Sequence, residues 1–244
     1  MAADGRRHVL AMGGIGTAGS YRVSPAGVPL LLAHAAALSG RDNPRICLLN
    51  TAMGDDPAGF LRAYSLLGRM RARVRHLELF PMPNTEDPAG LLLDQDVIFV
   101  AGGSVANMLA VWRVHALDEV MRQAWRSGVV LSGVSAGAIC WFAGGTTDSF
   151  GPALRPFTAG LGLLAGSYSP HYDSEPQRRP LTHSLIASGA LPPGIACDDG
   201  AAAHFTDDEL AEIVSHRDGA GGYRIAPAAA GAVETRLDAR PLEP

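Results

Sequence analysis

The chain has 244 residues, a formal net charge of -4 and 47% hydrophobic residues, which is enough apolar material for the core of one large α/β domain. Proteins that bind nucleic acids or anionic membranes need a basic surface, and this charge balance does not provide one. The composition therefore favours a small molecule, or a second copy of the chain in a homodimer, as the partner.

Short apolar runs rich in β-branched residues alternate with alanine- and leucine-rich segments in the first half of the chain. The runs predict strands at residues 8–12, 45–50, 74–80, 96–102 and 128–135. The segments between them predict helices at residues 29–40, 57–70 and 107–128. This alternation is typical of βαβ units, so the sequence predicts an α/β fold with a mostly parallel, doubly wound sheet.

The pattern loosens after residue 143 into a Gly-, Pro- and Ser-rich segment, where we expect a long functional loop. The runs at residues 201–205 and 210–216 are apolar enough to pair as strands at a sheet edge. From about residue 226 the chain is expected to be weakly structured. No repeat or break in composition marks a second domain, so we expect residues 1–244 to form a single domain.

Cysteine usage and the N-terminus indicate the compartment. Cys47, Cys140 and Cys197 lie in or beside apolar stretches without a C-x-x-C pair, which predicts free buried thiols and no metal site. The N-terminus lacks the apolar core of a signal peptide, and no apolar run is long enough to span a membrane. We therefore expect a cytoplasmic protein that needs no cofactor.

The segment SGVSAGAICWF places Ser135 between Gly133 and Gly137 in a G-x-S-x-G pattern. This spacing is typical of a nucleophile elbow, in which a strand turns sharply into a helix and exposes a serine hydroxyl. The backbone N–H of Ala136 would open that helix and point at the developing oxyanion. A second donor is expected at Gly103 or its neighbour, because Gly102-Gly103 ends another predicted strand.

A serine nucleophile also needs a base and a group that orients the base. Of the eight histidines, His171 follows a proline in the predicted long loop, from which it can reach across the strand ends. The other seven lie in apolar runs or in expected strands and helices, with His216 ending an expected helix. Asp198 and Asp199 form a strand-end carboxylate pair, and either could orient the imidazole.

The motifs VIFVAGG, SGVSAGAICWF, GLGLLAGSYSPHYD and DDG, in that order, resemble the peptidase E (dipeptidase E) family of serine peptidases over residues 8 to 215. The resemblance implies a three-layer α/β/α sandwich like that of class I glutamine amidotransferases, with serine replacing their cysteine. It implies Ser135 as nucleophile, His171 as base and Asp199, in preference to Asp198, as the orienting acid. Gly103 and Ala136 match the backbone donors of the oxyanion hole.

Two departures from the family pattern concern the substrate. Family members carry an asparagine after the glycines of the oxyanion loop, where this chain has Ser104. They hold an N-terminal aspartate with an arginine downstream of the histidine, and here Arg178 and Arg179 offer no clear match. Either arginine could bind a carboxylate or be solvated, and we favour solvation. The chain is identified as a divergent member whose aspartate specificity is not implied.

Other functions have weaker support. Gly14, Gly16 and Gly19 have the spacing of a dinucleotide-binding motif, but no helix follows at once and Asn50, not an acid, ends the next strand. We interpret this segment as a glycine loop that borders the active-site cleft. The sequence thus predicts a serine peptidase of short peptides. A binding protein of this fold that cleaves nothing, or a hydrolase of another amide, stays the alternative.

Overall fold

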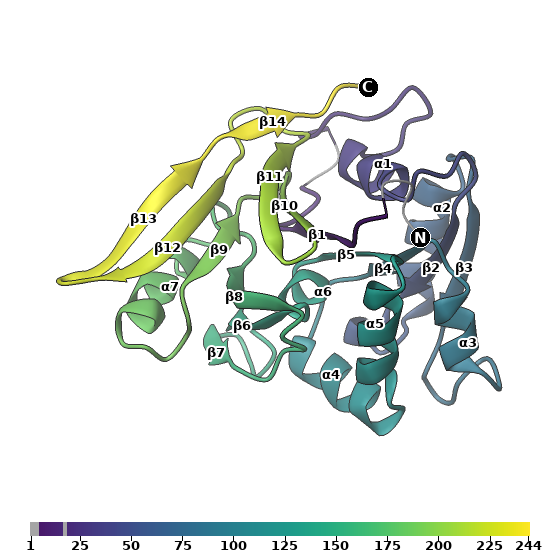
Figure 1. Ribbon diagram of the computed structural model, residues 1–244, viewed down its shortest axis with the longest axis horizontal. Coiled ribbons are helices and arrows are strands. Elements are labelled where there is room, and N and C mark those ends of the chain that lie inside the picture. Colours follow the sequence, from purple (N-terminus) through teal and green to yellow (C-terminus); the bar gives the residue numbers. More distant parts are fainter. Residues whose placement is uncertain (1–4, 17–18) are drawn as a thin grey trace.

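The structure is a computed structural model that describes residues 5–16 and 19–244, and it contains two β-sheets. The larger sheet has eight strands in the order β14-β11-β10-β1-β5-β4-β2-β3 (Figure 1). Their bounds are β1 His8–Met12, β2 Arg45–Leu49, β3 Arg73–Leu77, β4 Val97–Val100, β5 Val130–Val134, β10 Ala201–Thr206, β11 Glu209–Ser215 and β14 Ala239–Pro241. The strands from β1 to β3 in this order run parallel, which confirms the predicted sheet.

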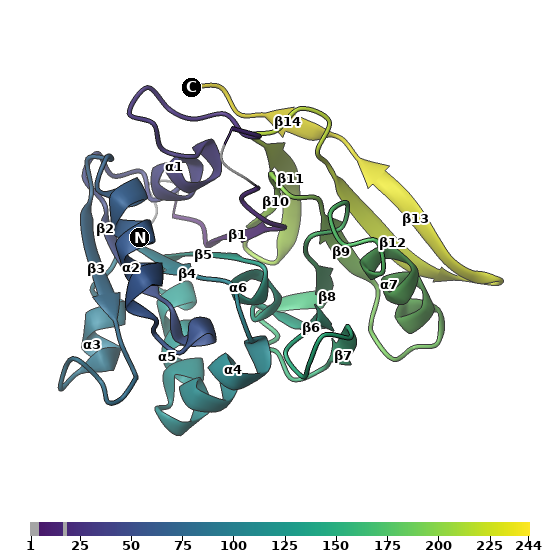
Figure 2. The ribbon, with the colours of Figure 1, turned by 180° about the vertical axis from the view of Figure 1, so that it is seen from behind.

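Helices cover both faces of the larger sheet (Figures 1 and 2). The helices α1 (Leu30–Ala37) and α2 (Pro57–Leu67) pack on one face, and α3 (Pro88–Leu93), α4 (Val105–Val114) and α5 (Leu117–Arg126) pack on the other. Strand β1 explains this sandwich, because Val9 and Ala11 face the second group while Leu10 and Met12 face the first. The three-layer α/β/α fold is therefore confirmed.

The helix expected at residues 107–128 is two helices. Chain direction changes at Ala116, which has a left-handed backbone with φ of 55°, and α5 begins at the next residue. The break lets both helices press apolar residues on the sheet, because Trp112 of α4 and Met121 of α5 are fully buried in the same core cluster. Helix α3 was not expected, and it begins after an Asp87 side chain that accepts from the Gly90 N–H.

The expected long loop after residue 143 is wrong, because most of it belongs to a second sheet with the order β13-β12-β9-β8-β6-β7. The bounds are β6 Phe142–Thr147, β7 Arg155–Phe157, β8 Leu164–Ser169, β9 Gly194–Cys197, β12 Gly222–Ala228 and β13 Gly231–Leu237. Helix α7 (Arg178–Ala187) packs on this sheet through Ile186, next to Tyr172 and Ile225. Short strands rich in Gly and Ser carry a weak periodic signal, which is why the pattern missed them.

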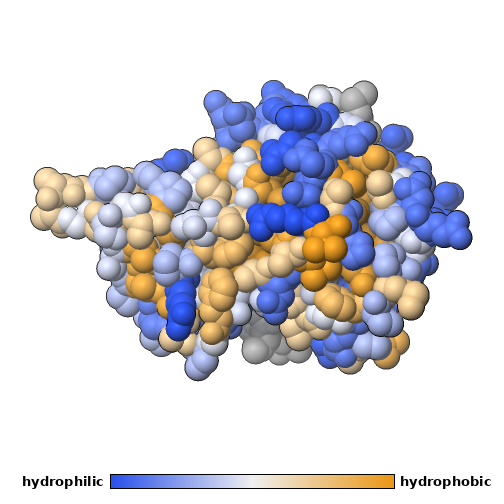
Figure 3. Space-filling model, turned by 90° about the horizontal axis from the view of Figure 1, so that it is seen from below, coloured by the Kyte–Doolittle hydropathy of each residue, from blue (hydrophilic) through white to orange (hydrophobic). Residues whose placement is uncertain are grey.

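The weakly structured tail expected from residue 226 is also wrong. Strands β12 and β13 form an antiparallel hairpin, β12 also pairs with β9, and β14 adds to the edge of the larger sheet. The hairpin projects from the body, and its tip appears in pale orange in the space-filling view because it is rich in alanine (Figures 1 and 3). Pairing along seven residues stabilises a segment whose composition alone looked unstructured.

The core contains the groups that the sequence placed there. Cys47, Cys140 and Cys197 are free and buried, as predicted. Trp141 and Phe142 are also fully buried; they follow the short helix α6 (Ala136–Ile139), and Phe142 begins β6. Among the described residues, no helix is long and apolar enough to cross a membrane.

Candidate active site

Three neighbouring parallel strands of the larger sheet end at one edge, and the segments that follow them contain Ser135 and the glycines of the predicted site. Strand β5 lies between β1 and β4, so the segments that follow these strands are adjacent. Gly13-Gly14 follows β1, Gly102-Gly103 follows β4 and Ser135 follows β5. Ligands of open α/β sheets bind at this edge, because the loops there can project freely from a fixed scaffold.

Ser135 adopts the strained geometry of a nucleophile elbow. Its φ of 55° and ψ of -115° lie outside the usual regions for a side-chain-bearing residue. The Ser135 N–H donates to the Met12 carbonyl at 3.1 Å, and α6 begins at the next residue. A Cβ at Gly133 would overlap the Gly137 carbonyl, and one at Gly137 would overlap the Val100 carbonyl. Both flanking glycines are therefore needed for this turn.

The segment after β4 approaches Ser135 closely. A Cβ at Gly102 would lie 3.3 Å from the Ser135 Cβ, and Gly103 has a φ of 130° that glycine adopts readily. In the described part of the chain, neither the Gly103 N–H nor the Ala136 N–H has a backbone hydrogen-bond partner. Two unengaged donors on either side of a serine are what an oxyanion hole requires.

His171 and Asp199 are paired beside the elbow. The Asp199 Oδ1 accepts from His171 Nδ1 at 2.7 Å, and the His171 N–H donates to the Gly13 carbonyl at 3.2 Å. His171 also has a left-handed φ of 50° in the turn after β8. Burial raises the pKa of Asp199, but the hydrogen bond and charge of His171 outweigh it and leave the pKa below its usual value. The carboxylate is thus ionised and holds the imidazole.

The structure distinguishes Asp198 from Asp199, the two candidates for the residue that orients the imidazole. The Asp198 carboxylate points away from His171 and accepts from the Gly221 N–H at 3.0 Å and the Tyr223 hydroxyl at 3.1 Å. Burial raises the pKa of Asp198. Asp198 therefore has a structural role between strands, and Asp199 is the residue placed to orient the imidazole.

The glycine segment after β1 explains why this pair can form. A Cβ at Gly14 would overlap the Asp199 carboxylate and lie 2.9 Å from His171 Nδ1. The Gly14 carbonyl accepts from the Gly200 N–H at 2.8 Å, so the backbones lie side by side. No helix follows β1 before Leu30, within the part of the loop that is described, and residues 17 and 18 of the motif lie outside it. The segment borders the site, as expected.

Ser135 and His171 line one cavity of about 210 Å³, in which His171 keeps its Nε2 available. The Ser135 hydroxyl makes no hydrogen bond to a described residue. The lining also includes three residues that the sequence analysis did not single out, namely Asp148, Ser149 and Glu175. No motif pointed to them, because they reach the cavity from the second sheet and the turn after β8.

The three residues named for substrate binding have different environments. Ser104 lines the cavity, and its hydroxyl caps α4 by accepting from the Asn107 N–H at 3.2 Å. The expected solvation of Arg178 is wrong, because its side chain is 2% exposed. Its Nε and Nη2 donate to the Glu175 carboxylate at 3.0 and 2.7 Å, and its Nη1 donates to the Thr146 carbonyl at 2.6 Å.

Arg179 lies outside this cavity. It pairs with Glu234 of β13, and its guanidinium lies 4.5 Å from the Tyr172 ring and 4.6 Å from the Tyr223 ring. These contacts tie α7 to the hairpin. Arg179 therefore supports the second sheet and does not face Ser135.

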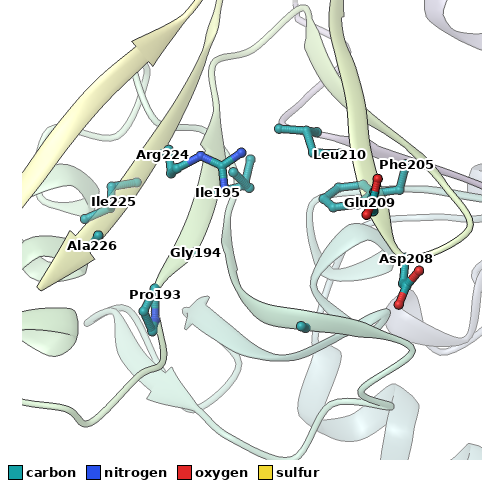
Figure 4. Close-up of a pocket in the computed structure, with 11 residues that line it drawn as sticks. Pro193, Gly194, Ile195, Phe205, Asp208, Glu209, Leu210, Arg224, Ile225 and Ala226 are labelled. Carbon is teal, nitrogen blue, oxygen red and sulfur yellow. The ribbon is translucent and has the colours of Figure 1, made fainter.

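A larger cavity of about 590 Å³ lies between β9, β12 and the β10–β11 hairpin (Figure 4). Arg224 projects from β12 on one side, and Asp208, Glu209 and Phe205 line the other (Figure 4). Its lining has no serine, cysteine or histidine. Its lining therefore lacks the hydroxyl or thiol nucleophile and the imidazole base of a serine or cysteine peptidase.

The other histidines are used elsewhere. His216 does not end a helix but follows β11, is fully buried, and its Nε2 donates to the Ile15 carbonyl at 2.9 Å. His183 pairs with Glu234 at 3.0 Å. Among the described histidines, His171 alone lines the cavity of Ser135.

Comparison with known proteins identifies the family of the chain. The model of peptidase family S51 matches residues 24–213, which include the elbow, the histidine segment and the acidic turn. The chain belongs to peptidase family S51. It is 42% identical to YgaJ, an uncharacterised peptidase of Bacillus subtilis (strain 168), over 219 residues that cover 90% of this chain and 92% of that protein.

More distant relatives agree with the family. A peptidase E of Shewanella denitrificans is 28% identical over 152 residues, covering 59% of this chain and 64% of that protein. A crystal structure of a peptidase from an acI-B1 actinobacterium superposes with a TM-score of 0.68 at 17% identity, covering 96% of both chains. The crystal structure of a candidate peptidase E of Listeria monocytogenes EGD-e superposes with a TM-score of 0.57 at 15% identity, covering 96% of this chain and all of that one. The chain is thus a peptidase with the S51 fold.

Proposed function

We propose that this S51 peptidase cleaves short peptides in the cytoplasm through Ser135, His171 and Asp199. The observation that carries the proposal is the 2.7 Å hydrogen bond between His171 Nδ1 and Asp199 Oδ1 beside an elbow serine of the same cavity. This bond fixes the tautomer in which Nε2 accepts a proton. The expected homodimer stays a prediction.

In the proposed reaction, Ser135 Oγ attacks the scissile carbonyl carbon while His171 Nε2 takes the hydroxyl proton. The tetrahedral oxyanion accepts hydrogen bonds from the N–H groups of Gly103 and Ala136. Collapse breaks the C–N bond, and His171 returns the proton to the leaving amine. Water, deprotonated by His171, then hydrolyses the acyl-enzyme and releases the second product with Ser135 restored.

The charges in the cavity argue against aspartate as the preferred residue. Two carboxylates, Asp148 and Glu175, face one guanidinium, Arg178, whose donors are already engaged by Glu175 and Thr146. An added substrate carboxylate would meet this negative balance without a free cation. We therefore propose that dipeptides with neutral or basic N-terminal residues are cleaved in preference to acidic ones.

The experiment is hydrolysis of a dipeptide library, with every residue type at the N-terminal position, by the wild type and Ser135→Ala. The expected result is cleavage by the wild type and a fall in kcat of about 10³-fold or more in Ser135→Ala, as for other triads. Asp199→Asn should also lose activity, while the Asp198→Asn variant should keep it if folded. No cleavage by a folded wild type would reject the dipeptidase and favour another amide substrate or a binding role.

A second measurement addresses the base. If neutral His171 accepts the serine proton, kcat/KM rises as acid solutions are made neutral. A phosphonate that labels serine nucleophiles should modify the wild type and leave Ser135→Ala unmodified. A rate that stays flat from about pH 5 to 9 would contradict the role of His171.

A further inference from the structure

Histidines that the proposed reaction does not use gather between α1 and the larger sheet. His34 projects from α1, His204 from β10 and His8 from β1, and Glu212 of β11 lies beside them. No motif in the sequence indicated this cluster, because its members are up to 204 positions apart. Pairing of β10 with β1 and β11 brings His8, His204 and Glu212 together, and α1 carries His34.

The distances within this cluster suit a metal ion. One donor atom from each of His34, His204 and Glu212 lies within 4.8 Å of the other two. The His204 Nδ1 lies 3.4 Å from the Glu212 Oε1, and its Nε2 lies 3.0 Å from the His8 Nδ1. The His34 and His204 rings meet edge to face with centroids 5.8 Å apart.

His34 has a polar atom that the protein itself does not satisfy. Its Nε2 is buried and has no hydrogen-bond partner among the described residues. Burial, followed by the charge of His204, lowers the pKa of His34 to about 4, and burial also lowers the pKa of His204. Neutral imidazole is the form that ligates metals. An unpartnered buried lone pair is costly unless a ligand fills the space.

We propose that His34, His204 and Glu212 form a binding site for a divalent transition-metal ion of the Zn²⁺ class. Two imidazoles and one carboxylate are a donor set that Zn²⁺ accepts, with water completing the coordination. Ca²⁺ and Mg²⁺ need several oxygen ligands, which this cluster does not offer. The proposal is independent of the Ser135 mechanism and departs from the expectation that the chain has no metal site.

The surrounding residues fit this assignment. His204 Nδ1–H donates to Glu212 Oε1 at 3.4 Å, and an ion bound between these two atoms would replace that proton. His204 Nε2–H would then donate to His8 Nδ1, which holds the tautomer that the ion requires. Arg240 of β14 holds both Glu212 oxygens, with Nε at 2.7 Å and Nη2 at 2.9 Å. This contact orients the carboxylate, while its positive charge opposes a dication. The ion would link α1 to strands β10 and β11 of the larger sheet.

The test is calorimetric titration of the chelator-treated full-length protein with Zn²⁺ alone, with circular dichroism as a check of folding. We expect one site per chain in the wild type and a loss of affinity of about 10- to 100-fold or more in His34→Gln and His204→Gln. Zn²⁺ should raise the melting temperature of the wild type and not of these variants. His115→Gln, at the end of α4, is the matched control and should bind as the wild type does.

Two further readouts decide the outcome. Co²⁺ should give the visible absorption bands of a low-coordinate site with nitrogen ligands in the wild type and in His115→Gln only. Arg240→Gln removes the opposing charge and should tighten binding. Absence of a site in the wild type, or equal affinity in folded His34→Gln and His204→Gln, would overturn the proposal.

Discussion

At the scale of single residues, backbone contacts at glycines control the proposed catalytic geometry. Gly14 lies against the Asp199 carboxylate, and Gly133 and Gly137 pack against carbonyls of neighbouring segments. None of these three has a positive φ, so space rather than backbone freedom requires glycine there. A methyl group at any of them would have to displace fixed backbone or the acid–base pair.

Gly14→Ala is therefore expected to reduce activity while the chain still folds. The new Cβ would overlap Asp199 and separate it from His171, so kcat should fall by up to about 10⁴-fold, the loss seen when the orienting acid of a triad is replaced. Peptide hydrolysis under single-turnover conditions measures this fall. Gly189→Ala is the control: its φ of 74° strains alanine, but its Cβ would meet nothing within 4 Å and it lies after α7, outside the cavity, so activity should be retained. Near wild-type turnover in Gly14→Ala would contradict the proposed pair.

We expect Glu175 to set the preference for the charge of the substrate's N-terminal residue, because Glu175 neutralises Arg178 inside the cavity. Glu175→Gln should raise kcat/KM for dipeptides with an acidic N-terminal residue, relative to neutral ones, by about tenfold, or 1.4 kcal/mol. Competition between an acidic and a neutral dipeptide in one reaction measures the ratio of their kcat/KM values. Asp208→Asn removes an exposed charge that lines the other cavity and should leave the ratio unchanged.

At the scale of elements, the β12–β13 hairpin supports the turn that carries His171. Glu234 of β13 accepts from the Tyr172 hydroxyl at 2.7 Å and from His183 Nε2 at 3.0 Å, and it pairs with Arg179. Burial opposes ionisation of Glu234, but these partners outweigh it and lower its pKa. A segment far along the chain thus holds the residue next to the proposed base.

Removing this carboxylate should loosen α7 and the hairpin together. We expect Glu234→Ala to lower the free energy of unfolding by about 1–3 kcal/mol, because it leaves the buried Tyr172 hydroxyl without a partner. Urea unfolding measures the change. Val233→Ala, at an exposed position of the same strand, should cost much less. Equal losses in the two variants would show that the Glu234 contacts contribute little.

At the scale of the whole molecule, buried neutral histidines make stability depend on pH. Burial lowers the pKa of His34 and of His216 to about 4, against 6.5 for an ordinary histidine. Between these values the unfolded chain binds protons that the folded chain does not. The free energy of unfolding should therefore fall as the pH falls from about 6.5 towards 4, by up to about 1.4 kcal/mol per pH unit for each histidine.

Urea unfolding at several pH values, with a chelator present, measures this slope. His216→Gln keeps an N–H donor for the Ile15 carbonyl and removes one titrating group, so its slope should be smaller than that of the wild type. The same slope in both proteins would mean that His216 does not titrate on unfolding in this range.

The sequence by itself determined the parallel sheet and the elbow, because both depend on short-range patterns. Strands such as β4 are apolar at every residue, and the G-x-S-x-G spacing around Ser135 is a local steric requirement. The resemblance to the S51 relatives rested on such local motifs, and the family match confirmed it.

Only the tertiary structure decided which distant residues meet. The second sheet joins strands from residues 142 to 237, and its weak periodicity hid it from the sequence. The same folding buries Arg178 against Glu175, places Arg179 beside the hairpin and pairs Asp199, rather than Asp198, with His171. Side-chain pairing across such separations depends on strand register and close packing, and neither is encoded in any short stretch of the chain.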